Sequence, residues 1–186
     1  GAAGHPNAYR VVPGAVQQII YHLDLGVFLA QSDVVVALLD EPIDEGVVVE
    51  IAYARLAGLP VVGLRTDVRS PYGEFADPCG GAHFFPVLQC DCYVHAAMPN
   101  AHGPQATADL QRLVDELDVA IGGLDRGPMT RPPARFAQLI ERAERLFGDL
   151  EDLHAEHSLR TLAERYLDQR DAILAAAPRK ISIPPA

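Results

Sequence analysis

Residues 32–67 read SDVVVALLDEPIDEGVVVEIAYARLAGLPVVGLRTD, and their pattern predicts a strand, a helix and a second strand in succession. The run Val34–Leu39 is continuously apolar and rich in β-branched residues, which is typical of a parallel strand buried on both faces. The second strand is predicted at residues 61–64, which follow Pro60 and are mostly apolar. Asp44 can cap the intervening helix, and Gly58 can end it in the left-handed conformation. The short connections predict a right-handed βαβ unit with parallel strands.

The rest of the chain places helices and one long loop around this unit. Helical spacing of apolar residues predicts a helix over residues 14–31. Gly- and Pro-rich residues 65–86 predict a long loop, and such loops are often functional. A short strand is predicted at residues 87–93. Further helices are predicted over residues 104–121, 136–147 and 159–174, with an extended tail over 178–186.

This order predicts an α/β fold, with an open parallel sheet of the Rossmann-like or flavodoxin-like kind and helices on both faces. We expect the α/β domain to occupy residues 1–125 and a C-terminal α-helical extension to occupy residues 126–186. The two amphipathic helices of the extension could form an interaction module, pack on their own sheet or form an oligomer interface.

Composition limits the function classes. The net charge of −10 opposes binding to the phosphate backbone of a nucleic acid polymer. No apolar run approaches the ~20 residues of a membrane span, and no signal peptide is visible, so we expect a cytoplasmic protein without membrane contact. The chain has three cysteines. Cys90 and Cys92 supply only two of the roughly four ligands of structural zinc, so no metal is expected.

Glu50 is the residue of the predicted helix that most needs an explanation. It follows Val47–Val49 and precedes Ile51, and a carboxylate buried without a partner is costly. Ligands of open parallel sheets bind at the carboxyl ends of strands, where Asp40 and the start of this helix are expected. Glu50 therefore faces a cleft, is paired or takes part in a reaction. Structural functions also remain open, because an acidic residue stabilises the helix dipole and Asp44 alone can be a cap.

The stretch resembles the signature of the nucleoside 2-deoxyribosyltransferase family. Members of the family carry three successive motifs similar to a-D-[IV]-V-V-A-L-L-D, D-x-G-x-x-x-E-[IL]-G-Y-A and L-G-K-P-V-x-G-L-R-T-D-x-R. The corresponding pieces of this chain are Ser32–Asp40, Asp44–Ala54 and Leu56–Arg69. The resemblance implies a double displacement with retention and without a cofactor, the logic of retaining glycosidases.

The resemblance also implies residue roles. Glu50 would attack C1′ of a 2′-deoxynucleoside and hold a covalent deoxyribosyl ester. Asp24 would protonate the leaving base, and Asp44 would orient the sugar and the nucleophile. A second base would then take the sugar, in competition with water. Tyr53, one helical turn from Glu50, would orient it or simply pack. Substrate-binding positions are implied at Asp40, Gly46, Tyr53, Asp67 and Arg69.

Asp44 also bears on the substrate. Related deoxynucleoside 5′-monophosphate N-glycosidases resemble this pattern but place a small hydroxyl residue there, and an aspartate would repel a phosphate dianion. We therefore expect a free nucleoside and a nucleobase as partners. The active sites shared between subunits in the family imply a homo-oligomer. The alternatives are an N-glycoside hydrolase of nucleosides or 5′-monophosphates, and a non-catalytic binding domain of the same fold.

The chain departs from the family pattern in the residues that line the base pocket of family members. The family's opening strand and glycine-rich turn, resembling I-Y-L-A-G-P-x-F, is not found in residues 1–31. Ala52 replaces a glycine, and Asp44–Val47 replaces D-S-G-T. Residues 72–81 lack the Asn that a neighbouring subunit contributes to sugar binding. The residues that would select the base are therefore not visible.

Overall fold

The chain forms an open parallel sheet of three strands with helices packed on it. The strand order is β1-β2-β3, and both neighbouring pairs are parallel. The strands are β1 (Val35–Leu38), β2 (Val61–Arg65) and β3 (Cys92–His95). The structure, a computed structural model, describes residues 16–98, 102–125, 127, 129, 132–152 and 155–175. The predicted mixed α/β class with an open parallel sheet is confirmed.

The βαβ unit has the local structure predicted for it. Helix α3 (Glu45–Ala57) connects β1 and β2. The Asp44 side chain accepts a hydrogen bond from the Gly46 N–H at 2.7 Å, and Gly58 ends the helix with a φ of 82°. The capping carboxylate and the left-handed glycine satisfy backbone groups that the helix itself leaves free. Both ends of the helix that carries Glu50 are therefore determined locally.

Helices cover the two faces of the sheet unequally. On one face, strand residues pack with α3 in the main core. On the other face, Val62 and Val94 pack with Leu113 of α5 (Pro104–Gly122), whereas Val36 and Leu38 of β1 remain exposed. The expectation that residues 34–39 are buried on both faces is wrong, because β1 is an edge strand of the described sheet and α5 packs on β3. The main core includes Ala37, Leu39, Ile51, Ala54, Leu59 and Val61.

The helix predicted over residues 14–31 changes type within its length. It is an α-helix in α2 (Val16–Leu23) and a π-helix in η1 (Asp24–Leu29). The wider turn of a π-helix is rare and frequently occurs at functional sites. Gly26 of η1 lies against α6 (Ala134–Phe147), where an added Cβ would stand 2.4 Å from the Ala143 Cβ. The close approach of η1 and α6 therefore requires glycine at this position.

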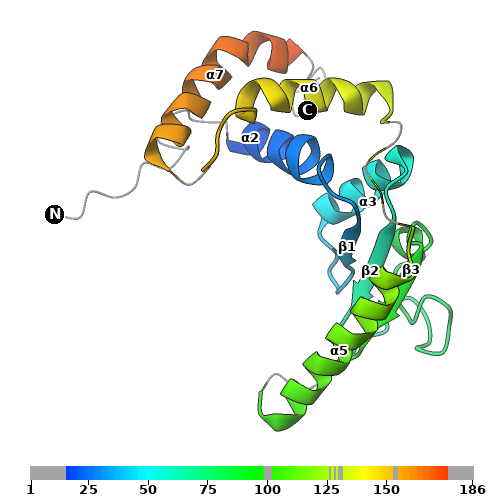
Figure 1. Ribbon diagram of the computed structural model, residues 1–186. Coiled ribbons are helices and arrows are strands. Elements are labelled where there is room, and N and C mark those ends of the chain that lie inside the picture. The colour runs from blue at the N-terminus through cyan, green and yellow to red at the C-terminus, as the bar shows by residue number, and fades with distance from the viewer. Residues whose placement is uncertain are drawn as a thin grey trace, which may run out of the picture.

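The two C-terminal helices pack with the N-terminal helix at one end of the molecule. Helix α6 and helix α7 (Glu156–Ala175) confirm the two predicted helical stripes. Phe136 and Leu139 of α6 lie in the main core with η1, α3 and β1. Further along, α6 forms a second core with Ile19 of α2 and Leu162 of α7. Figure 1 shows α2, α6 and α7 at one end, the sheet in the middle and α5 at the other end. The extended tail predicted for residues 178–186 lies outside the described residues.

The third strand begins later than predicted. Residues 84–87 form the one-turn helix α4 (Phe84–Val87), and only Cys92–His95 pair with β2. The His83 side chain accepts a hydrogen bond from the Phe85 N–H at 3.3 Å at the start of α4. Pro86 has no N–H to donate to a strand ladder. The strand predicted over residues 87–93 is therefore wrong at its beginning, and Val87 is buried in a helical turn.

Candidate active site

Glu50 and Asp24 line one cavity with a volume of about 290 Å³. Asp24 is the first residue of η1, and Glu50 lies in the second turn of α3. Both carboxylates are half-buried. The cavity lies beside the edge strand β1 instead of at the carboxyl ends of the strands, where we expected the site. Its remaining lining residues are Phe28, Leu29, Ser32, Val34, Val35 and Val36.

The two carboxyl groups in this cavity have raised pKa values. Burial raises the pKa of Glu50, and the negative charges of Asp24 and Asp44 raise it further. Burial also raises the pKa of Asp24. Neighbouring carboxyl groups with raised pKa values can divide their states, one holding a proton while the other is ionised. An acid and a nucleophile need this division.

Asp44 lies close enough to influence Glu50 but does not line the cavity. Its Oδ1 atom accepts the hydrogen bond from Gly46 that begins α3. A Cβ added to Gly46 would stand 2.8 Å from that oxygen, so glycine leaves room for the cap. In this structure Asp44 and Gly46 together set the start of the helix that presents Glu50.

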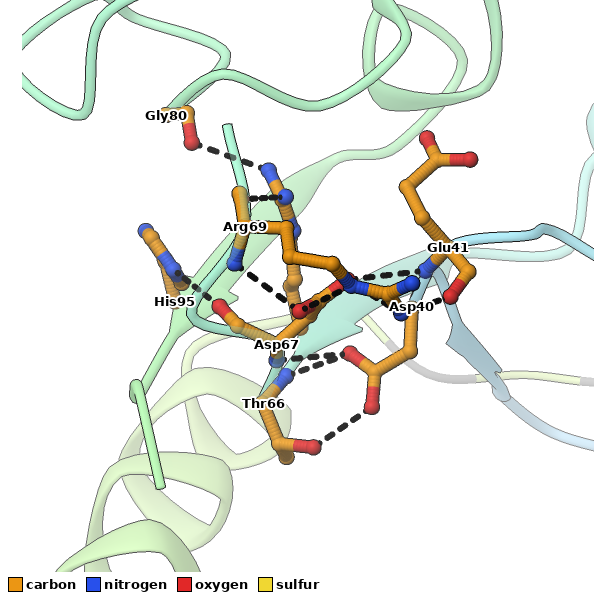
Figure 2. Close-up of polar contacts among 8 residues, drawn as sticks. Asp40, Glu41, Thr66, Asp67, Arg69, Gly80 and His95 are labelled. Carbon is orange, nitrogen blue, oxygen red and sulfur yellow. Dashed lines mark hydrogen bonds and ion pairs between the residues drawn. The ribbon is translucent and has the colours of Figure 1, made fainter. Parts of the chain in front are cut away.

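Asp40, Asp67 and Arg69 form a separate group at the carboxyl ends of β1 and β2 (Figure 2). Asp40 accepts hydrogen bonds from the N–H groups of Thr66 and Asp67 at 2.7 and 2.9 Å, and from the Thr66 hydroxyl at 2.6 Å. Asp67 accepts from Arg69 Nε at 2.9 Å and from the Glu41 N–H at 3.2 Å. The hydrogen bond from Arg69 holds the pKa of Asp67 well below its usual range.

This group is a brace between loops. It ties the segment after β1 to the segment after β2, and none of its three members lines the cavity of Glu50. Arg69 also donates to the Glu41 carbonyl oxygen (Figure 2), so the two segments are joined from both sides. The structure therefore brings Asp24, Asp44 and Glu50 near one another and places Asp40, Asp67 and Arg69 elsewhere.

The substitution Asp40→Ala is expected to lower the free energy of unfolding by about 2–3 kcal/mol, because three donors lose a charged acceptor. Chemical denaturation followed by circular dichroism measures this loss. Asp33→Ala is the matched control, since Asp33 is an exposed aspartate just before β1. The control should change stability by less than about 0.5 kcal/mol. Equal stability of the two variants would contradict a bracing function for Asp40.

Tyr53 points its ring into the packing between α3 and α6. Its ring centroid lies 4.8 Å from that of Phe136, edge-on at 63°. The pKa of Tyr21 is raised to about 12 by burial and then by a hydrogen bond with Tyr53. Tyr53 does not line the cavity of Glu50. In this structure the Tyr53 ring therefore packs against α6.

The sequence pattern did not single out Phe28 and Ser32, which line the cavity with Asp24. The three residues follow one another at intervals of four, a spacing that places side chains on one side of a helix. The Ser32 hydroxyl donates to the Phe28 carbonyl oxygen at 2.7 Å. This spacing was a signal that could have added both residues to the candidate site.

The structural importance of Arg65 was also not predicted from the sequence. Its side chain is fully buried at the end of β2. Its Nη1 donates to the Gly80 carbonyl oxygen at 2.9 Å, and its Nη2 donates to that of Arg69. These bonds hold the two ends of the loop that follows β2. No local pattern distinguishes a buried arginine from an exposed one, so only the structure could reveal it.

In the part of the chain that the structure describes, no group of three or more His, Cys, Asp or Glu residues could hold a metal ion. None of the described helices is long and apolar enough to cross a bilayer. The three cysteines are free and half-buried. No protein-family model, curated protein or solved structure matches this chain.

Proposed function

We propose that this chain transfers a 2-deoxyribosyl group between nucleobases through a covalent ester on Glu50. The observation that carries the proposal is the cavity shared by Glu50 and Asp24. The two carboxyl groups come from distant parts of the sequence, and both have raised pKa values. The resemblance of residues 32–69 to the nucleoside 2-deoxyribosyltransferase signature supplies the substrate class.

In the first step, ionised Glu50 attacks C1′ while the N-glycosidic bond breaks. The electron pair of that bond leaves with the base, and protonated Asp24 gives its proton to the departing nitrogen. In the second step, a nitrogen of another base attacks C1′ from the side that the first base left. Its proton passes to Asp24, and the Glu50 carboxylate is released. Two inversions at C1′ give net retention.

The proposal includes the fold and the organisation of the chain. The three parallel strands would belong to a Rossmann-like sheet in a domain of residues 1–125, with residues 126–186 as its helical extension. The packing of Phe136 in the main core supports an extension that is integral to the domain. We further propose a cytoplasmic homo-oligomer that acts on free nucleosides without a cofactor, because the charge of Asp44 near Glu50 disfavours a phosphate.

A hydrolase with the same Glu50 chemistry is the second candidate. Phe28 and Val36 line the cavity and are 55% and 43% exposed. Water can therefore reach a sugar ester on Glu50 and take the place of the second base. In this version the products are the free base and 2-deoxyribose.

Mass spectrometry after incubation with 2′-deoxyadenosine tests both candidates. We expect the mass of one deoxyribosyl unit on the peptide that contains Glu50. A second incubation with added hypoxanthine then separates them, because a transferase forms 2′-deoxyinosine and a hydrolase releases free sugar. The absence of both adduct and turnover across purine and pyrimidine deoxynucleosides would overturn the proposal.

The pH dependence of adduct formation tests the arrangement of charges. Glu50 must be ionised to attack, so the rate rises as the pH increases through its pKa. Asp24 must keep its proton to protonate the base, so the rate falls as the pH rises through the pKa of Asp24, which burial raises. Asp24→Asn is therefore expected to reduce the rate and to remove this falling limb, because asparagine has no such proton to lose. Burial is the largest cause of the raised pKa of Glu50, so the rising limb should stay above the ordinary range for glutamate in the variant. Asp33→Asn, with its exposed carboxylate before β1, should keep both limbs in place. A falling limb that persists in Asp24→Asn would argue against Asp24 as the acid.

A further inference from the structure

A second cavity, of about 500 Å³, lies between the outer edge of β3 and helix α5. One wall is the strand segment 92–97. The other wall comes from one side of α5 and consists of Arg112, Glu116, Val119 and Ala120. β3 is the last strand in the order of the described sheet, so its outer edge carries free backbone groups. We call this cavity the β3–α5 groove.

The outer edge of β3 is suited to receive another strand. The Ala96 N–H donates inward to the Arg65 carbonyl oxygen at 2.9 Å. Since amides alternate sides along a strand, those of Tyr93 and His95 face outward. Lysine and proline residues on an edge strand commonly prevent the addition of another strand. The segment 92–97 contains neither residue type. An extended segment in the β3–α5 groove would bond to these amides and pack one row of its side chains on α5.

The α5 wall specifies the side chains of that row. Val119 is 72% exposed and lies beside Ala120, and Glu116 stands one turn earlier. The neighbouring residues Asp115 and Asp118 add to the negative charge of this helix. Arg112, one turn before Glu116 in the same wall, forms an ion pair with Asp109 at 3.2 Å. The matching segment therefore carries apolar residues at alternate positions, with a basic residue at the end that meets Glu116.

Residues 179–183, RKISI, have this pattern. Arg179, Ile181 and Ile183 fall on one side of an extended chain, and Pro184 ends the stretch that can pair. Because α5 runs antiparallel to β3 (Figure 1), a segment antiparallel to β3 would place Arg179 near Glu116. An extended chain advances about 3.4 Å per residue and a helix about 1.5 Å, so Ile181 would then lie on Val119 and Ala120, and Ile183 would lie beyond them toward the end of α5. The charge of Arg179 and the apolar side chains of the segment therefore both match α5 only when the segment runs antiparallel to β3.

A second copy of the chain must supply this segment. Helix α7 ends at Ala175, and the four Cα–Cα steps from there to Arg179 span about 15 Å at most. Figure 1 shows α7 and α5 at opposite ends of the molecule, with the sheet between them. We propose that residues 179–183 of one copy add as an antiparallel strand to β3 of another copy in the β3–α5 groove. This contact is independent of the chemistry proposed for Glu50.

Two measurements test the proposal on folded protein. Sedimentation velocity compares the 186-residue chain with a variant that lacks residues 176–186, and only the longer chain should associate. Fluorescence anisotropy then measures binding of a labelled peptide of residues 176–186 to the shortened variant. Val119→Asp should weaken this binding at least tenfold. Leu167→Asp is the matched control, because Leu167 is 53% exposed on α7, away from the groove, and it should have no effect.

A charge exchange tests the direction of the added strand. Glu116→Arg should weaken binding of the natural peptide, and the peptide with Arg179→Glu should restore it. The proposal is overturned if the shortened chain associates as the longer one does. It is also overturned if the peptide does not bind, or if it binds the Val119→Asp and Leu167→Asp variants equally. Circular dichroism of each variant ensures that a loss of binding is not a loss of folding.

Discussion

Replacing Glu50 with alanine is expected to reduce deoxyribosyl transfer by about 10³-fold or more, because the variant has no nucleophile to form the ester. Chromatography of the exchanged bases measures the residual rate. Glu45→Ala is the matched control, since Glu45 is an exposed glutamate in the first turn of the same helix and does not line the cavity. Glu45→Ala should retain at least half of the activity.

The fold of the Glu50→Ala variant should be at least as stable as the parent. The pKa of Glu50 is raised in the folded chain, so the folded state favours its protonated form. The ionised side chain therefore opposes folding at neutral pH, and this opposition disappears as the pH falls below the pKa of the unfolded chain. Thermal melts at pH 7 and pH 4 measure the difference. Full transfer activity in the variant would exclude Glu50 as the nucleophile.

Phe136→Ala is expected to have the largest effect on stability, a loss of about 3–5 kcal/mol in the free energy of unfolding. The Phe136 side chain is fully buried and contacts the Tyr53 ring in the core that α6 shares with η1, α3 and β1. Its removal leaves a cavity that the surrounding helices cannot readily fill. Guanidinium denaturation followed by circular dichroism measures the loss.

Phe85→Ala provides the control for Phe136→Ala, because the same side chain is 65% exposed at α4. Its cost should be below about 1 kcal/mol. A similarly small cost for Phe136→Ala would mean that α6 is not integral to the main core. The comparison therefore tests whether the helical extension beginning at residue 126 stabilises the sheet or only adjoins it.

The prediction from sequence succeeded where the determinants are local. Asp44 caps α3 through an amide two residues away, and Gly58 ends it through its own backbone conformation. It was least accurate where neighbours in space decide. Residues 34–39 looked like a strand buried on both faces, yet Val36 is exposed because no described helix covers that part of the sheet. The strand expected from residue 87 begins at Cys92, because Phe84–Val87 form a helical turn.

The candidate site shows the same division. The resemblance selected Asp24, Asp44 and Glu50, but the relation of Asp24 to Glu50 depends on the π-helix η1 and its tight contact with α6 at Gly26. Asp40, Asp67 and Arg69 belong to the same sequence signature, yet their hydrogen bonds join loops away from the cavity. Residues that are neighbours in this stretch of sequence therefore do not all line one cavity.

The sequence by itself determined the βαβ unit, the ends of α3 and the presence of a carboxylate on an otherwise apolar helix. These features depend on periodicity and on hydrogen bonds between residues a few positions apart. Only the tertiary structure decided that Asp24 and Glu50 share a cavity, that Tyr53 packs on Phe136, and that β3 is an edge strand beside α5 among the described residues. These depend on how distant elements pack, and packing is set by the shapes and volumes of side chains that a linear pattern does not place together.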